Sequence, residues 1–242
     1  TKKLKILDKI KTGDDPEIFD IDYNNNYAAV SNEDDNQLTI INLNNKKIIA
    51  RINDVGVEPE GVNFSPDGKL IYVTSEGTSS VLIIDVIEKK IVNEILVGNR
   101  PRRGLFVNGG TEYWVSNELS GTVGIIDTAK QEIKKTIKFA IKGIREQQIT
   151  PVDFAYAKKN NLVFVTLGSA NHVAVVDVNT YEIKKYILVG NRVWGADITA
   201  DEKELVVTNG NSDDISIIDL EKLVSTSAIP VGKTPHSVRI MK

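Results

Sequence analysis

Charged and aromatic residues cluster in and just after a short turn motif, Val-Gly-x-x-Pro or a close variant, that recurs along the chain. These residues are Glu17, Glu58, Glu60, Arg100, Arg102, Arg103, Arg145, Arg192, Trp194 and His236. Guanidinium groups bind carboxylates through two parallel hydrogen bonds, and an indole ring offers a flat stacking wall. The set therefore predicts a site for a carboxylate-bearing ligand or an acidic protein patch. Alternatively, the arginines pair with Glu17, Glu58 and Glu60 and hold neighbouring loops together.

A second series of acidic residues occupies equivalent positions in other loops, namely Glu33, Glu76 and Glu118. Several carboxylates together could take part in a Ca²⁺ site, because hard cations bind several oxygen ligands. No repeat carries a dense, complete ligand loop, so we expect no metal site and no required cofactor. His236 could serve as a base or as a haem ligand, and it is placed with the binding residues.

Composition excludes several classes of chemistry. The 242 residues contain no Cys and two His, which rules out a disulfide framework, a thiolate site and a three-His metal site. The net charge of −3 gives no global basic field, so no nucleic-acid partner is expected. No apolar run is long enough for a membrane span, and no serine nucleophile motif or phosphate-binding loop is present. The sequence therefore predicts no catalytic residues.

The elements that position these residues follow from a repeat. A short apolar run ends in an acidic or amide residue at Asn42, Asp85, Asp127, Asp177 and Asp219, with spacings of 43, 42, 50 and 42 residues. A proline series at positions 16, 59, 101, 151 and 235, with Val193 in register, has the same period. The eight extra residues of the long repeat fall between Phe139 and Pro151.

Each period contains four short segments rich in strand-forming residues, such as 61–64, 70–74, 81–86 and 91–97, with turn residues between them. Four strands in about 40 to 45 residues are typical of a β-propeller blade. We therefore predict an all-β propeller, one domain over 1–242 with five full repeats. Leu4–Ile10 aligns with an outer strand and Ser237–Met241 with an inner one. The interpretation is an N-terminally incomplete fragment of a seven-bladed propeller, with six blades as the alternative.

The segments Tyr72-Val73-Thr74-Ser75, Ala29-Val30-Ser31-Asn32, Trp114-Val115-Ser116-Asn117 and Val206-Val207-Thr208-Asn209 resemble the YVTN-type β-propeller repeat. The succession DPEIF, SNEDDN, VGVEPEGV, TSEGTSS, VGNRPRRGLF, SNELSGTV, LGSANHVAVVD, LVGNRVWG and TNGNSDDISIID is similar, blade by blade, to the β-propeller proteins associated with pyrroloquinoline quinone (PQQ)-dependent catabolism. The resemblance covers essentially the whole chain.

This resemblance implies a periplasmic or secreted, non-catalytic binding or scaffold protein that serves quinoprotein alcohol oxidation. It implies a quinoprotein dehydrogenase or a cytochrome c as partner, and PQQ or another small molecule as ligand. Two alternatives stay open. One is a propeller enzyme of the lactonase or quinoprotein type, with its site at the channel mouth. The other is a cell-surface adhesion or stalk propeller.

Overall fold

Five four-stranded antiparallel sheets form the chain in the computed structural model, which describes residues 5–6 and 8–241. Blade 1 contains β1 (Pro16–Ile21), β2 (Tyr27–Asn32), β3 (Gln37–Asn42) and β4 (Lys47–Asn53). Blade 2 contains β5 (Pro59–Phe64), β6 (Leu70–Ser75), β7 (Ser80–Asp85) and β8 (Lys90–Leu96), and blade 3 contains β9 (Pro101–Val107), β10 (Glu112–Asn117), β11 (Thr122–Asp127) and β12 (Glu132–Lys138). Blade 4 contains β13 (Phe154–Ala157), β14 (Leu162–Thr166), β15 (His172–Asp177) and β16 (Ile183–Leu188), and blade 5 contains β17 (Val193–Ile198), β18 (Glu204–Asn209), β19 (Asp214–Asp219) and β20 (Val224–Pro230). Two 3₁₀ turns, η1 (Asn108–Gly110) and η2 (Glu146–Gln148), lie between strands. The predicted propeller blades are confirmed.

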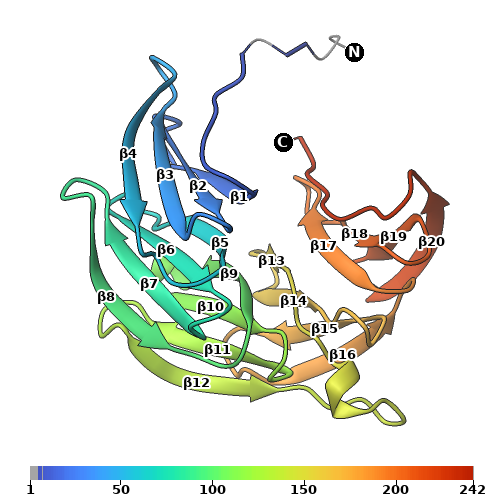
Figure 1. Cartoon of the computed structure of the whole chain (residues 1–242). Helices are drawn as coiled ribbons and strands as arrows, with labels where there is room; N and C mark the ends of the chain where they lie inside the picture. Colours follow the sequence, from blue (N-terminus) through green and yellow to red (C-terminus); the bar gives the residue numbers. More distant parts are fainter. Residues whose placement is uncertain (1–4, 7, 242) are drawn as a thin grey trace.

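The blades follow one another around an open arc, with their first strands on the inside and their fourth strands outside (Figure 1). Alternation of side chains along each strand explains why the sheets stack. Ile71 and Val73 of β6 pack in one buried cluster with Leu38 of blade 1. Tyr72, between them in sequence, packs in another buried cluster with Tyr113 of blade 3. Both faces of blade 2 are thus buried, because its sheet lies between those of blades 1 and 3.

A hydroxyl group links each of blades 1 to 4 to the next blade, and a fifth links blade 5 to the C-terminal segment. The hydroxyl oxygens of Ser31, Thr74, Ser116, Thr166 and Thr208 each accept an N–H near the start of the inner strand of their own blade and donate to a carbonyl oxygen 28 to 36 residues ahead. Thr74 shows the pattern, because it accepts from Gly61 N–H at 2.7 Å and donates to the Arg102 carbonyl at 2.8 Å. The accepting carbonyls belong to Glu60, Arg102, Val152, Trp194 and His236. The third residue of the YVTN-like segments therefore fixes the start of each inner strand.

The described residues of the two predicted terminal segments form no strand. Leu4 and Leu7 lie outside the described residues, and residues 5, 6 and 8–10 adopt no strand, nor do residues 237–241. The C-terminal segment nevertheless lies beside β17, because Gly195 N–H donates to the His236 carbonyl at 3.1 Å and Ile240 N–H donates to Asp197 Oδ2 at 2.8 Å. It occupies the position of the next inner strand, but no following strand of the described chain pairs with it to make a ladder.

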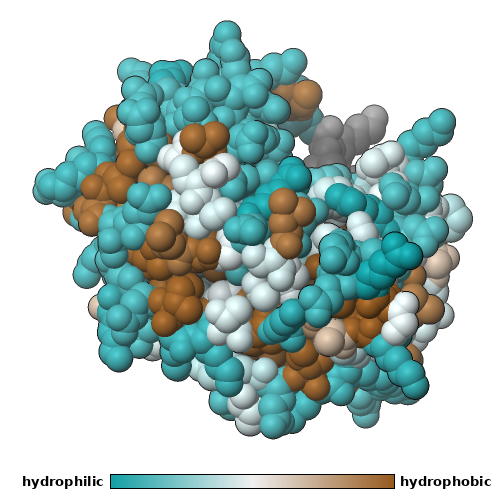
Figure 2. Space-filling model, turned by 60° about the horizontal axis from the view of Figure 1, so that its bottom comes forward, coloured by the Kyte–Doolittle hydropathy of each residue, from teal (hydrophilic) through white to brown (hydrophobic). Residues whose placement is uncertain are grey.

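The surface is mostly hydrophilic, and its hydrophobic side chains gather in several separate patches on the face seen in Figure 2. Exposed large hydrophobic residues include Phe19, Tyr23, Ile87 and Leu119. Among the residues that the structure describes, no helix has the length and apolar character needed to cross a membrane.

Candidate functional site

The charged ring predicted from the sequence lies where the inner strands begin, on the inside of the arc. We call this end of the arc the mouth. Glu60 is the second residue of β5, Arg102 and Arg103 are the second and third of β9, and Trp194 is the second of β17. Because the preceding blade holds the backbone of these residues through a Ser or Thr hydroxyl, their side chains vary without disturbing the fold.

Arg102 and Arg103 are buried and paired with buried glutamates. Arg102 Nη1 bonds Glu76 Oε1 and its Nη2 lies 3.4 Å from Glu60 Oε1, while Arg103 Nη1 bonds the same Glu60 oxygen. Burial alone would lower the pKa of Arg102, but Glu60, Glu76 and Glu118 raise it. Burial raises the pKa of Glu60, against the lowering effect of Arg103 and Arg102. These two arginines thus form a structural ion network.

The pairing differs in part from the one expected. Glu60 pairs as predicted, whereas Glu17 and Glu58 make no ion pair among the described residues. Glu76 and Glu118, predicted as part of a second acidic series, are the remaining partners of the arginines. Glu58 instead has a left-handed backbone at φ 54° and accepts the Glu76 N–H through its carbonyl. The two predicted acidic series therefore meet in one site.

Two further arginines extend the network to the surface. Arg100 Nε lies 2.6 Å from Glu76 Oε2 and 3.4 Å from Glu118 Oε2. Arg192 Nη2 lies 3.5 Å from Glu118 Oε1, and its Nη1 donates to Ser169 Oγ at 2.9 Å. The side chains of Arg100 and Arg192 are 45% and 32% exposed, so solvent and ligands reach them. They are the accessible cations of the mouth.

An aromatic pair lies among these arginines. The guanidinium carbon of Arg192 lies 4.5 Å from the centre of the Trp194 ring, and that of Arg102 lies 5.5 Å from it. The His236 ring centre is 4.7 Å from Trp194, with the planes inclined by 40°. Cations over an indole face are held by the ring quadrupole. The mouth thus combines flat rings with guanidinium groups, as the sequence predicted.

Two titratable groups show that charge is divided across the mouth. Burial, together with Glu17, Glu60 and Glu76, raises the pKa of Glu33 to about 7. On the other side, burial together with Arg103 and Arg102 lowers the pKa of His236. Blades 1 and 2 therefore contribute an acidic half, and the residues around Trp194 contribute a basic half.

The acidic half contains the groups that could hold a metal ion. Carboxylate oxygens of Asp15, Glu17 and Glu33 lie within 4.8 Å of one another, as do those of Glu33, Glu58 and Glu76. Glu118, the third member of the second acidic series, is in neither set and pairs with Arg100 and Arg192. Glu33, rather than the full predicted series, is therefore the centre of any cation site here.

Sequence reasoning misplaced one residue and missed two. Arg145 is exposed at the start of η2, where its N–H donates to Gln148 Oε1, and it makes no contact with the network among the described residues. Asp153 and Arg239 line a cavity of about 420 Å³ with Arg103 on the inside of the arc. Asp153 could have been found from the repeat, because it holds the position that Arg103 holds in the preceding repeat. The structure shows this equivalence, since the Asp153 N–H donates to the Thr166 hydroxyl just as the Arg103 N–H donates to the Ser116 hydroxyl.

Comparison with known proteins gives a family and a fold. The family model described as "Choice-of-anchor I domain" matches residues 1–219. Antigen Lp49 of Leptospira interrogans is 22% identical over 71% of this chain, and dihydro-heme d1 dehydrogenase of Pseudomonas aeruginosa is 23% identical over 87% of it. This chain spans 40% and 43% of those two proteins.

Solved structures show the same architecture. The dihydro-heme d1 dehydrogenase NirN in complex with DHE superposes with a TM-score of 0.72 at 21% identity, over 87% of this chain and 45% of that one. Kuenenia stuttgartiensis hydrazine synthase superposes with a TM-score of 0.69 at 14% identity, over 97% of this chain and 92% of that one. At these identities the likeness extends to the fold alone.

Proposed function

We propose that this chain, which belongs to the Choice-of-anchor I domain family, is an extracytoplasmic, non-catalytic binding module whose mouth recognises a flat ligand bearing carboxylates. PQQ, a tricyclic quinone that carries carboxylates, is the first candidate, and the module would serve PQQ-dependent alcohol oxidation. The blade-by-blade resemblance of the sequence supports this choice. The anchor in the family's name supports an extracytoplasmic location.

The observation that carries the proposal is the arrangement of Arg192 and His236 around the Trp194 ring, at 4.5 and 4.7 Å. A flat ring system can stack on such aromatic groups, and accessible guanidinium groups bind carboxylates through paired hydrogen bonds. Arg100 and Arg192 are accessible, whereas Arg102 and Arg103 are occupied by glutamates. The ligand's carboxylates would therefore meet Arg100 and Arg192.

Charge division across the mouth supports an oriented ligand. Glu17 and Glu58 would repel carboxylates, so an anionic ligand would lie on the side of Trp194. A protein partner, either a quinoprotein dehydrogenase or a cytochrome c, would approach the same end of the arc to exchange the ligand. The relative from Pseudomonas aeruginosa is named for a haem-type substrate, which supports the choice of a flat, unsaturated ligand.

An enzyme remains the second candidate, and one observation favours it. The pKa of Glu33, raised to about 7, is suited to general acid–base catalysis near neutral pH. A lactonase-type reaction at the mouth would use this carboxyl group. Turnover of a lactone panel by the purified chain, abolished in Glu33→Gln, would favour the enzyme over the binding module. The adhesion or stalk alternative predicts tandem copies of the propeller in the full-length protein.

Calorimetric titration of PQQ into the purified chain tests the proposal. We expect saturable micromolar binding, about −8 kcal/mol. Trp194→Leu should weaken it at least tenfold by removing the stacking surface. Ile87→Ala is the control, because Ile87 is a hydrophobic residue that is 80% exposed in the hairpin between β7 and β8, away from the mouth. Absence of heat at high protein concentration would contradict PQQ as ligand and favour a protein partner instead.

A further inference from the structure

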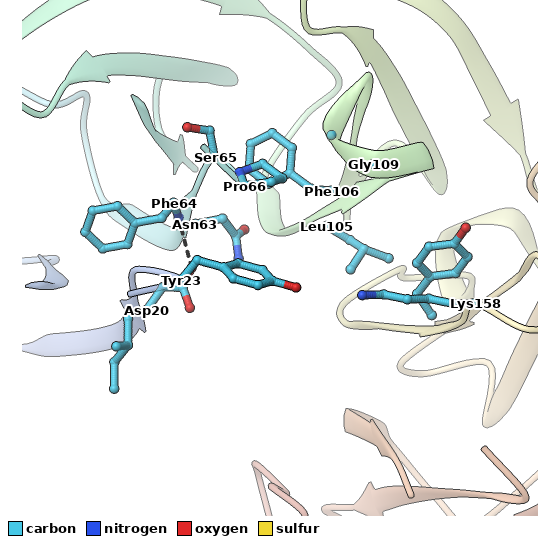
Figure 3. Close-up of a pocket in the computed structure, with 13 residues that line it drawn as sticks. Asp20, Tyr23, Asn63, Phe64, Ser65, Pro66, Leu105, Phe106, Gly109 and Lys158 are labelled. Carbon is cyan, nitrogen blue, oxygen red and sulfur yellow. Dashed lines mark hydrogen bonds between the residues drawn. The ribbon is translucent and has the colours of Figure 1, made fainter. Parts of the chain in front are cut away.

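A cavity lies at the opposite end of the inner strands from the mouth, where β1, β5 and β9 end. Its volume is about 490 Å³. Its lining includes Tyr23, Asn63, Pro66, Leu105, Phe106 and Lys158, which come from blades 1 to 4. Figure 3 shows the Tyr23 hydroxyl and the Lys158 amine facing each other across this pocket. We call it the lower pocket.

One wall of the lower pocket is held in place by a buried aromatic cluster. The Phe106 ring centre lies 5.0 Å from that of Tyr72 and 4.7 Å from that of Tyr113. The Tyr113 hydroxyl donates to Asn63 Oδ1 at 3.0 Å, which fixes a polar lining residue as well. Tyr72 and Tyr113 are fully buried. The wall is therefore preformed, as small-molecule pockets usually are.

The acidic residue of the lower pocket has a structural role. Asp20 Oδ2 accepts the Phe64 N–H at 2.9 Å, the bond drawn in Figure 3, and so ties blade 1 to blade 2. Asp197 makes the same kind of bond to Ile240 N–H at 2.8 Å. Asp20 is the acidic group of this lining, and a second negative charge placed beside its carboxylate would be repelled. An anionic ligand group would therefore lie at the other end of the pocket.

Lys158 supplies a positive charge at that other end. Its side chain is exposed and forms no ion pair within the described part of the chain. The next residue, Lys159, is engaged instead, because its Nζ donates to the Asp201 carbonyl at 2.9 Å and its N–H to Glu202 Oε2 at 2.9 Å. Of these neighbouring lysines, Lys158 alone lines the pocket.

We propose that the lower pocket binds a small aromatic carboxylate. The ring packs against Leu105, Phe106 and Pro66, and the carboxylate pairs with the Lys158 ammonium group. Apolar walls with one or two convergent polar groups are what such ligands require. The ammonium group is a compact charge suited to a single carboxylate. This site shares no lining residue with the mouth.

Three probes that share one ring system test the charge preference. Ligand-observed NMR titrations would use naphthalene-2-carboxylate, naphthalene-2-methanol and 2-naphthylmethylamine with the whole chain. We expect affinity to fall in that order, with the carboxylate bound at least fivefold more tightly than the alcohol. Lys158→Gln should remove the advantage of the carboxylate over the alcohol, whereas Lys159→Gln should keep it.

Other outcomes would overturn the proposal. Absence of saturable binding of the carboxylate would exclude the site, and tightest binding of the amine would show that Asp20 governs it. Equal affinities for the carboxylate in the wild type and in Lys158→Gln would show that Lys158 does not pair with the ligand's carboxylate. A loss of carboxylate binding in Arg192→Ala would place that ligand at the mouth instead.

Discussion

The Thr74 hydroxyl donates a 2.8 Å hydrogen bond to the carbonyl oxygen of Arg102 in the next blade, while it accepts the N–H of Gly61 in its own. One side chain thus satisfies two buried backbone groups in two sheets. A Cβ on Gly61 would lie 2.5 Å from the Arg102 carbonyl oxygen, which shows how closely the two inner strands approach each other. This contact therefore sets the backbone geometry of the mouth.

Thr74→Val should therefore destabilise the protein strongly, although valine has nearly the same shape. The buried Gly61 N–H and Arg102 carbonyl would each lose a partner, at about 1 to 3 kcal/mol for each group. Thr74→Ser should stay close to wild type, because Ser31 and Ser116 make the equivalent bonds in blades 1 and 3. Urea unfolding of the three proteins checks this, and equal stability of the Val and Ser variants would contradict it.

Stability should separate the buried arginines from the exposed ones. Arg103→Ala leaves Glu60 buried with fewer partners, and breaking a buried pair in this way costs about 3 to 5 kcal/mol. Arg192→Ala removes a partly exposed pair, worth about 1 kcal/mol or less. Denaturant midpoints measure both. If the two variants lose the same stability, the division of the network into structural and accessible arginines is wrong.

Stability should also depend on pH through Glu33. Its pKa in the folded protein is about 7, above the about 4.3 of an unfolded glutamate. Between those values the folded protein keeps a proton that the unfolded chain has lost, so stability falls as pH rises and the full penalty applies above pH 7. Glu33→Gln should therefore raise the melting temperature at pH 8 and change it little at pH 4.

A matched control for this effect is Glu94→Gln, which removes an exposed carboxylate from the outer strand β8. It should shift the melting temperature little at either pH. A gain for Glu33→Gln that is as large at pH 4 as at pH 8 would show that the effect is not electrostatic.

The sequence predicted the blades because a strand's alternation and its turn residues are local signals. Asp85 shows this, since its Oδ1 accepts the N–H groups of Ile87 and Glu88 in the hairpin, as a turn carboxylate should. Trp114 aligned with strand residues and is buried in the core. The prediction of the two terminal strands was wrong for the described residues, because a strand forms only beside a hydrogen-bonded neighbour. Aligning a single segment with a repeat does not show whether such a neighbour is present.

The site was predicted only as a set of residues. The position just after the repeated turn motif identified Arg102, but which carboxylate it contacts depends on how neighbouring blades face each other. Its partners are the expected Glu60 and also Glu76, which belongs to the other predicted acidic series. The lower pocket gave no sequence signal, because its lining residues come from four blades and meet only when those blades assemble.

The most direct test of the central claim compares two double variants in a calorimetric titration with PQQ. Arg100→Gln with Arg192→Gln removes the accessible cations of the mouth, while Lys142→Gln with Arg145→Gln removes the same charge from the exposed loop before blade 4. We predict that the first pair lowers affinity at least tenfold and that the second pair binds as the wild type does. An equal loss of PQQ affinity in both double variants, or wild-type affinity in Arg100→Gln with Arg192→Gln, would contradict recognition at the mouth.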